Sequence, residues 1–274
     1  MPLTDPLPSL EEILGSIGTG GVRLAGIDAT EGGAGNVSVC IGWPIEVRRQ
    51  FPMSEVIELP VAAPHLAGHT VLVTGSGRRL RDLDRLPLES IGAVVVHDDG
   101  THGTLHTAPV RQFEVLTSEW NSHLAVHDDT VARTGSNFHT VVHAQPPHLV
   151  YLSHIADYRD EDFFSRRLIR WQPETIVQLP AGIGILPFMR PSSAELSDAT
   201  VESLRNHRIT VWSKHGVMAR SDISVTRAVD RIEYAEAGAR YEYMDLMAGG
   251  RGEGLTTEES IELVREFGVE TKLF

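Results

Sequence analysis

The chain has 274 residues, 41% of them hydrophobic and 22% charged, a composition typical of a globular protein with a substantial core. Its net charge of −13 argues against nonspecific binding to nucleic acid or an anionic membrane, and no run approaches the ~20 apolar residues of a membrane span. A single cysteine, Cys40, excludes an internal disulfide, and the N-terminal segment lacks the pattern of a secretory signal. We therefore expect a cytoplasmic protein.

The numbers of lysines and histidines distinguish between two kinds of chemistry, a lysine Schiff base and a metal site. Of the 24 Lys and Arg residues only Lys214 and Lys272 are lysines, which leaves little room for a lysine Schiff base. The chain also has 13 histidines, several of them clustered. This balance favours a metal site.

The predicted elements begin with a short helix, because Ser9 and Glu12 form a capping box and the glycines from Gly15 to Gly21 should break the helix soon after it starts. Further on, short segments rich in β-branched residues are bounded by Gly, Pro or Asp and predict strands. These strands are expected at Val37–Ile41, Thr70–Val73, Ala93–Val96, Thr140–Val142 and Ile209–Trp212.

Helical periodicity and capping residues predict the remaining elements. Helices are expected at Glu119–His127, Asp162–Arg170, Ser197–Asn206 and Ile223–Met244, and a last one from Thr256. Strands and helices alternate without a linker-like tract, which indicates one α/β domain over residues 1–246. The glycine-rich stretch from Met247 to Gly254 then predicts a loose connection to a helical appendage over residues 247–274.

Two histidine segments are candidates for a metal site. In FHTVVHAQPPHLVYLSH, strand alternation places His143 and Gln145 on one face, and the next two residues, both prolines, end the strand. In ITVWSKHGVMA, His215 ends another predicted strand and is followed by Gly216. A metal site needs ligands from different elements, so neither segment suffices alone, and polar residues at turns are the alternative interpretation.

The segment LTSEWNSHLAVHDD carries a candidate acid or base. Ser118 is expected to cap a helix beginning at Glu119, whose carboxylate would lie at the positive end of the helix dipole. An ordinary first-turn glutamate is the alternative. His123 and His127 are one turn apart, as in helical metal pairs, but the chain has no HExxH motif.

Two glycine-rich segments, EGGAGNVSV and VTGSGRRL, are candidates for anion binding through exposed backbone N–H groups. Ordinary turn glycines are the alternative. Neither segment has the spacing of a dinucleotide-binding fingerprint, so a nucleotide-dependent oxidoreductase has little support.

Taken in order, EGGAGNVSV, VTGSG, LTSEWNSH, VVHAQPPH, LPAGIGILPFM and VWSKHGVM resemble the class II aldolase and adducin family, from about Gly20 to Met244. The resemblance implies a three-layer α/β/α fold around a mainly antiparallel sheet. It also implies a homotetramer with active sites at subunit interfaces, where Tyr241 and Tyr243 are candidates to reach a neighbour.

The resemblance further implies a divalent metal, zinc first and Mn²⁺ or Co²⁺ as alternatives. His143 and His215 match the first and last metal ligands, Gln145 stands where the family has a histidine, and Glu119 matches the catalytic glutamate. Because a carboxamide is a weaker zinc ligand than imidazole, Gln145 ligates weakly, or His148 or Glu119 completes the site, or a harder metal is preferred. The implied phosphate-binding residues are Gly35, Asn36, Gly75, Ser76, Thr117 and Ser118.

The implied reaction is reversible aldol cleavage of a ketose 1-phosphate, such as rhamnulose 1-phosphate, to dihydroxyacetone phosphate and an aldehyde. A related sugar-phosphate epimerase, dehydratase or decarboxylase is the alternative within the fold, and a non-catalytic adducin-like binding module is the alternative outside enzymes. The glutamate at position 119 favours the aldolase over the epimerase branch, which carries aspartate there.

Overall fold

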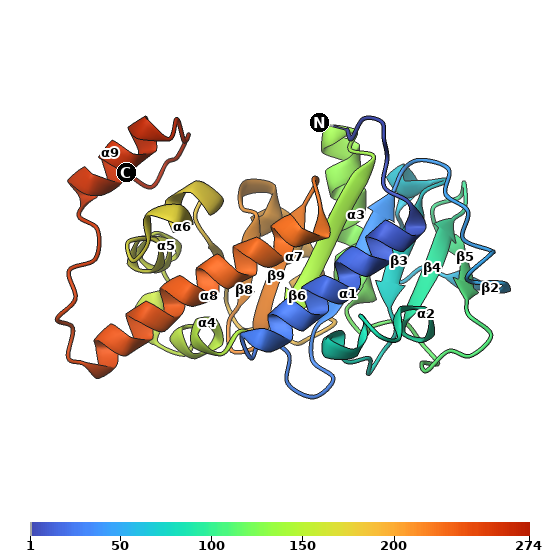
Figure 1. Ribbon diagram of the computed structural model, residues 1–274, viewed down its shortest axis with the longest axis horizontal. Coiled ribbons are helices and arrows are strands. Elements are labelled where there is room, and N and C mark those ends of the chain that lie inside the picture. The colour runs from blue at the N-terminus through green and yellow to red at the C-terminus, as the bar shows by residue number, and fades with distance from the viewer. Residues whose placement is uncertain (1) are drawn as a thin grey trace.

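The computed structural model describes residues 2–274, and nine strands between Asn36 and Ser221 form one mixed sheet (Figure 1). The strand order is β2-β5-β4-β3-β1-β6-β9-β8-β7, and all neighbouring strands are antiparallel except β7 and β8, which are parallel. The predicted α/β class and the mainly antiparallel sheet are therefore confirmed.

The strands are β1 (Asn36–Ile41), β2 (Met53–Glu58), β3 (Thr70–Thr74), β4 (Ile91–Val96), β5 (His102–Thr107), β6 (Phe138–Ala144), β7 (Gly184–Leu186), β8 (Ile209–Trp212) and β9 (Gly216–Ser221). The α-helices are α1 (Leu10–Gly26), α2 (Pro87–Ser90), α3 (Trp120–Thr134), α4 (Pro147–Leu152), α5 (Glu161–Ile169), α6 (Pro173–Gln178), α7 (Ala194–Asn206), α8 (Val225–Met247) and α9 (Thr257–Glu266). Short 3-10 helices occur at η1 (Pro64–Leu66), η2 (Leu80–Asp82) and η3 (Ala156–Arg159).

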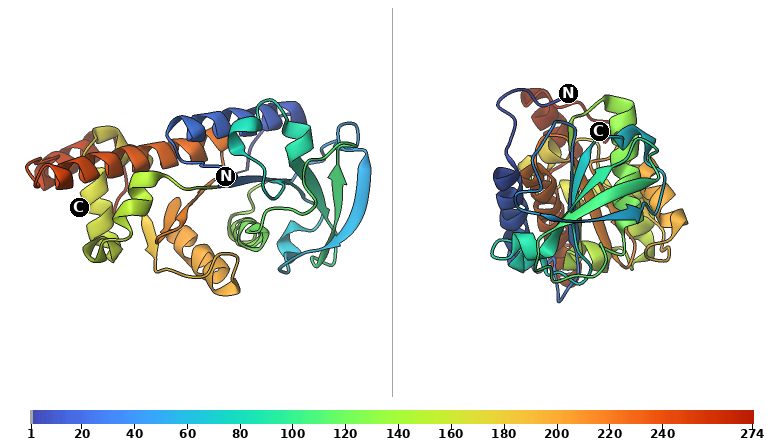
Figure 2. Two further views of the ribbon diagram at one scale, coloured as in Figure 1. Left: turned by 90° about the horizontal axis from the view of Figure 1, so that it is seen from below. Right: turned by 90° about the vertical axis from the view of Figure 1, so that its right-hand side faces the viewer.

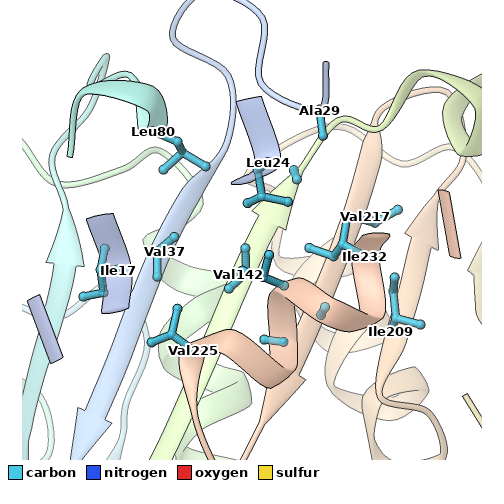
Figure 3. Close-up of a cluster of buried hydrophobic side chains, with 14 of the residues drawn as sticks. Ile17, Leu24, Ala29, Val37, Leu80, Val142, Ile209, Val217, Val225 and Ile232 are labelled. Atoms are coloured by element: carbon cyan, nitrogen blue, oxygen red, sulfur yellow. The ribbon is translucent and has the colours of Figure 1, made fainter. Parts of the chain in front are cut away.

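Helices cover both faces of the sheet, and strand alternation decides which side chains meet which helices (Figure 2). On one face, the helices α1 and α8 pack on residues such as Val37, Val142 and Val217 (Figure 3). On the other face, α3 and α7 pack on the strand residues that alternate with those of the first face. Val141 and Met218 there form a cluster with Trp212. The polar residues of the candidate site lie on this second face.

The glycines of the first helix do not interrupt it, so the predicted break between Gly15 and Gly21 is wrong. Helix α1 runs to Gly26, and its capping box between Ser9 and Glu12 is present as predicted. A Cβ atom on Gly21 would lie 2.1 Å from the carbonyl oxygen of Leu80. This glycine therefore lets η2 approach the helix closely, and tertiary packing outweighs the low helix propensity of glycine.

All five predicted strands are present, but β2, β5, β7 and β9 were not predicted. Strand β2 lies at the edge of the sheet and is almost wholly exposed, and β7 has only three residues. Neither gives the alternation of apolar and polar residues that identifies a half-buried strand. The predicted helices from Glu119, Asp162, Ser197 and Ile223 correspond to α3, α5, α7 and α8.

The C-terminal segment after α8 folds back along the molecule to α9 (Figure 1). It is held by backbone contacts. The amide of Leu255 donates to the carbonyl of Arg170 at 2.7 Å, and the amide of Gly252 donates to the Asp245 carboxylate at 2.6 Å. Within residues 2–274, no helix is both long and apolar enough to cross a membrane.

Candidate metal and catalytic centre

Glu119, His143 and His215 converge on one point, from the start of α3, the end of β6 and the turn between β8 and β9. Their nearest ligand atoms all lie within 4.8 Å of one another. The Glu119 carboxylate is 3.6 Å from Nε2 of His143 and 3.4 Å from Nε2 of His215. Two imidazoles and a carboxylate from three separate elements form a donor set that suits a divalent metal ion.

His143 is oriented by its second ring nitrogen. Its Nδ1–H donates to the carbonyl of Val217 at 2.9 Å, which leaves Nε2 as the bare nitrogen facing Glu119. The ring also stacks on Trp212, with centroids 4.9 Å apart. A backbone hydrogen bond and a packed aromatic ring together fix both tautomer and orientation, as in protein metal sites generally.

His215 approaches this ring because the next residue is glycine. A Cβ atom on Gly216 would lie 2.5 Å from the carbonyl oxygen of Ala144 and 2.7 Å from Cε1 of His143. Burial, followed by the nearby ring of His143, lowers the pKa of His215, which favours the neutral form that binds metals. Its Nδ1 atom is buried and has no hydrogen-bond partner among the described residues.

Glu119 is buried and is held by an asparagine. The amide nitrogen of Asn36 donates to Oε2 of Glu119 at 2.6 Å. The expectation that Ser118 caps α3 is wrong: Glu119 itself occupies the N-cap position without a side-chain cap. The hydroxyl of Thr117 accepts from the Glu119 amide instead, at 3.4 Å, and the carboxylate faces the two histidines.

Gln145 and His148 differ in their relation to this centre. The Cγ atom of Gln145 lies 3.2 Å from the position that a Cβ atom on Gly216 would take, so its side chain lies beside the His215 turn. His148 instead donates through Nδ1 to Glu236 at 2.6 Å and packs against Tyr243. His148 is therefore engaged away from the point where Glu119, His143 and His215 converge, whereas Gln145 lies beside it.

Three loops containing the predicted phosphate-binding residues lie side by side. Gly75 pairs with Leu116, Ser76 N–H donates to the carbonyl of Val115 at 2.9 Å, and a Cβ atom on Gly33 would lie 3.5 Å from the carbonyl of Gly77. Gly35 adopts a φ of +85°, a conformation that favours glycine, directly before Asn36. The structure thus brings these segments together.

The backbone amides of this cradle are mostly engaged already. Gly75, Ser76 and Thr117 donate their N–H groups to backbone carbonyls at 2.8, 2.9 and 3.1 Å. These three N–H groups are therefore not exposed for anion binding, so contacts of Ser76 and Thr117 with a phosphate would come from their hydroxyls. Thr117 and the exposed Ser118 also line a cleft of about 830 Å³, whose lining residues do not include Glu119, His143 or His215.

The role of Asn36 toward Glu119 and the contribution of Trp212 were not predicted from the sequence. A signal for Asn36 was present, because Asn36, Ser38 and Cys40 alternate along β1 and must share a face. In the β1–β6 register, Asn36 lies directly opposite His143. Nothing in the sequence indicated that Trp212 stacks on His143, because strand pairing and ring packing bring them together.

Comparison with known proteins finds relatives over most of the chain. Residues 21–243 match the family described as Class II Aldolase and Adducin N-terminal domain. A rhamnulose-1-phosphate aldolase from Bacteroides thetaiotaomicron is 31% identical over 87% of this chain and 88% of its own length. A second rhamnulose-1-phosphate aldolase, from Klebsiella pneumoniae, is 31% identical over 78% of this chain and 76% of its own length.

The solved structures agree with these sequence relatives. The crystal structure of a sugar-phosphate aldolase from Thermotoga maritima superposes with a TM-score of 0.74 at 26% identity, covering 89% of this chain and 99% of that chain. The chain therefore belongs to the class II aldolase and adducin family, in which it is a carbon–carbon lyase that resembles rhamnulose-1-phosphate aldolase.

Proposed function

We propose that the protein is a metal-dependent aldolase that reversibly cleaves a ketose 1-phosphate, rhamnulose 1-phosphate or a close analogue, into dihydroxyacetone phosphate and an aldehyde. The observation that carries this proposal is the convergence of Glu119, His143 and His215 within 4.8 Å. The names of the relatives, two rhamnulose-1-phosphate aldolases and a sugar-phosphate aldolase, support the substrate class.

His143 and His215 would hold the metal through their Nε2 atoms, with Gln145 as a weak third ligand and a carboxylate oxygen of Glu119 in reach of the same point. Zinc is the first candidate for this nitrogen-rich set, and Mn²⁺ or Co²⁺ would suit the harder oxygen of Gln145. When bound, the metal supplies Lewis-acid stabilisation of the negative charge that develops on the ketose oxygens as the carbon–carbon bond breaks.

Glu119 holds and returns the proton at the carbon that becomes C3 of dihydroxyacetone phosphate. The residue is only 5% exposed, which excludes bulk water from the proton transfer, and the bond from Asn36 fixes one carboxylate oxygen. The other oxygen, Oε1, faces His215. A carboxylate held in this way is positioned for a single acid–base step.

The substrate phosphate would bind in the cradle of Gly35, Asn36, Gly75, Ser76, Thr117 and Ser118, mainly through hydroxyl groups because several of the amides are engaged. We propose that residues 1–246 form the catalytic domain and that a cyclic homotetramer completes each active site. Tyr241 is 46% exposed at the far end of α8 and is a candidate to contact a neighbouring subunit.

The decisive experiment measures release of dihydroxyacetone phosphate from L-rhamnulose 1-phosphate, with a chelator and after addition of Zn²⁺, Mn²⁺ or Co²⁺. We expect chelator-sensitive release that one of these ions restores. A protein that binds the ions but releases nothing would favour a related epimerase, dehydratase or decarboxylase. A protein that retains no metal would favour the binding module, for which Gln145 is the supporting feature.

A further inference from the structure

A continuous chain of hydrogen bonds leads from Glu119 away from the metal centre into the interior. Its first links are the bond from Asn36 Nδ2 to Oε2 of Glu119, at 2.6 Å, and the contact between Asn36 Oδ1 and Nε2 of His123, at 2.5 Å. Both ends of the Asn36 amide are therefore engaged. An amide that turned over would present its oxygen to the carboxylate, so His123 decides whether Asn36 can hold Glu119.

The chain continues through the second face of the sheet, between α3 and the strands β1 and β6. Nδ1 of His123 lies 2.6 Å from the hydroxyl of Ser38, which lies 2.7 Å from Nε2 of His127. Nδ1 of His127 in turn lies 2.8 Å from Nδ1 of His139. These four side chains are wholly buried, with 0% exposure.

The direction of every bond in the chain is set by Glu119. A carboxylate only accepts, so Asn36 donates to it and the Asn36 oxygen must accept from Nε2–H of His123. A neutral His123 then has a bare Nδ1 that accepts from the hydroxyl of Ser38. Burial, together with the neighbouring histidine, lowers the pKa of His123 far below its usual range, in keeping with the neutral ring.

The same matching of donors to acceptors fixes the directions of the hydrogen bonds between Ser38, His127 and His139. The Ser38 oxygen accepts from Nε2–H of His127, whose bare Nδ1 accepts from Nδ1–H of His139. This assignment predicts that the last atom, Nε2 of His139, is a bare acceptor. That atom is buried and is without a partner in the described part of the chain. A chain of hydrogen bonds with this direction therefore ends on an acceptor atom that makes no hydrogen bond.

We propose that Ser38, His123, His127 and His139 are positioning residues, which fix the Asn36 amide and through it the catalytic geometry of Glu119. The inference rests on the proposed function, because it assigns Glu119 the proton step. The chain does not conduct protons, since a carboxamide lies between the carboxylate and the first imidazole. Its contribution is orientation, strengthened because successive hydrogen bonds in a dry interior polarise one another.

Ser38→Ala interrupts the chain with the loss of one oxygen atom and leaves Asn36 and Glu119 in place. Without that hydroxyl Nδ1 of His123 loses its donor, so the ring is held at only one end and fixes the Asn36 oxygen less firmly. The matched control is Ser122→Ala. Ser122 is equally buried, precedes His123 on α3, and its hydroxyl has no hydrogen-bond partner within residues 2–274.

We expect Ser38→Ala to lower kcat for aldol cleavage by about 10- to 100-fold, the usual effect of removing an outer-shell partner. KM and metal content should be unchanged, and Ser122→Ala should match the unaltered enzyme. An equal kcat in both variants, or a parallel loss of metal and kcat in Ser38→Ala, would overturn the positioning role.

A second measurement needs no variant. Nitrogen-15 NMR of the unaltered protein at neutral pH should show His123 and His127 protonated on Nε2 and His139 protonated on Nδ1. The opposite tautomers in an active enzyme would overturn the chain and leave the aldolase intact. An unaltered protein that shows these tautomers but cleaves no ketose 1-phosphate with any of the metals would instead overturn the proposed function.

Discussion

Gly216 and His143 are in such close contact that no other residue fits at position 216. A Cβ atom there would lie 2.7 Å from Cε1 of His143 and 2.5 Å from the Ala144 carbonyl oxygen. Gly216→Ala should therefore displace one of the two histidine rings that we propose bind the metal and lower kcat/KM by about 100-fold, the scale of a 1 Å misplacement. Metal content and kcat/KM of the purified variant check this. Gly26→Ala, where a Cβ atom would meet nothing within 4 Å, is the control and should behave as the unaltered protein.

Glu119→Gln tests the proton step. The amide oxygen of glutamine can still accept the bond from Asn36, so the local structure should persist while the acid–base group is lost. We expect kcat to fall by about 10²- to 10⁴-fold, the range for general acid–base catalysis, with metal content preserved. Glu195→Gln, at an exposed glutamate in the first turn of α7, is the control. Unchanged turnover in Glu119→Gln would remove this residue from the mechanism.

Gln145→His would test the departure from the family pattern. An imidazole is a stronger zinc ligand than a carboxamide, so zinc should dissociate more slowly and survive a higher chelator concentration. The measurement is residual zinc after dialysis against increasing chelator, for the variant and the unaltered protein side by side. Identical retention curves would mean that residue 145 does not contact the metal.

Two glycines of helix α1 should respond in opposite ways to alanine. Gly15 is exposed and has no neighbour within 4 Å of a Cβ position, so Gly15→Ala should raise the free energy of unfolding by about 0.5–1 kcal/mol. At Gly21 a Cβ atom would lie 2.1 Å from the Leu80 carbonyl oxygen. Gly21→Ala should therefore overpack this contact and lower the free energy of unfolding by about 1–3 kcal/mol or more. Urea denaturation of both variants measures the difference, and equal shifts would contradict the packing argument.

The buried histidines should make the metal-free protein sensitive to acid. Burial lowers the pKa of His127 to about 3, and burial likewise holds those of His123 and His139 well below the usual value. Between these values and the unfolded pKa of about 6.5, only the unfolded chain takes up the protons. The unfolding free energy therefore falls as the pH drops below about 6.5, by about 1.4 kcal/mol per pH unit for each ring.

Denaturant titrations of the metal-stripped protein from pH 7.5 to 5.0 check this dependence. His139→Gln removes one titrating ring, so the slope of its unfolding free energy against pH should be smaller than that of the unaltered protein by about 1.4 kcal/mol per pH unit. The comparison uses slopes, because the substitution also changes stability at neutral pH. Parallel curves for the two proteins would contradict the role of His139.

Much of the fold is determined by local pattern alone. The capping boxes of Ser9 and Thr256 begin helices where the sequence predicts them, because a cap is satisfied within four residues. Five strands were also predicted, because a run of buried β-branched residues is itself a local pattern. Edge strand β2 and the three-residue β7 were not predictable, because pairing with neighbouring strands rather than their own pattern makes them strands.

The sequence by itself determined the candidates for the chemistry: Glu119, His143 and His215 stand in an order that resembles one family. Only the tertiary structure decided how they meet, because the three lie on different elements and converge through the pairing of β6 with β9 and the packing of α3 on the sheet. It also decided that His148 turns to Glu236 and that Asn36 joins Glu119 to a chain of buried histidines. Hydrogen bonds between residues about 85 positions apart depend on the register of strands, which no local pattern records.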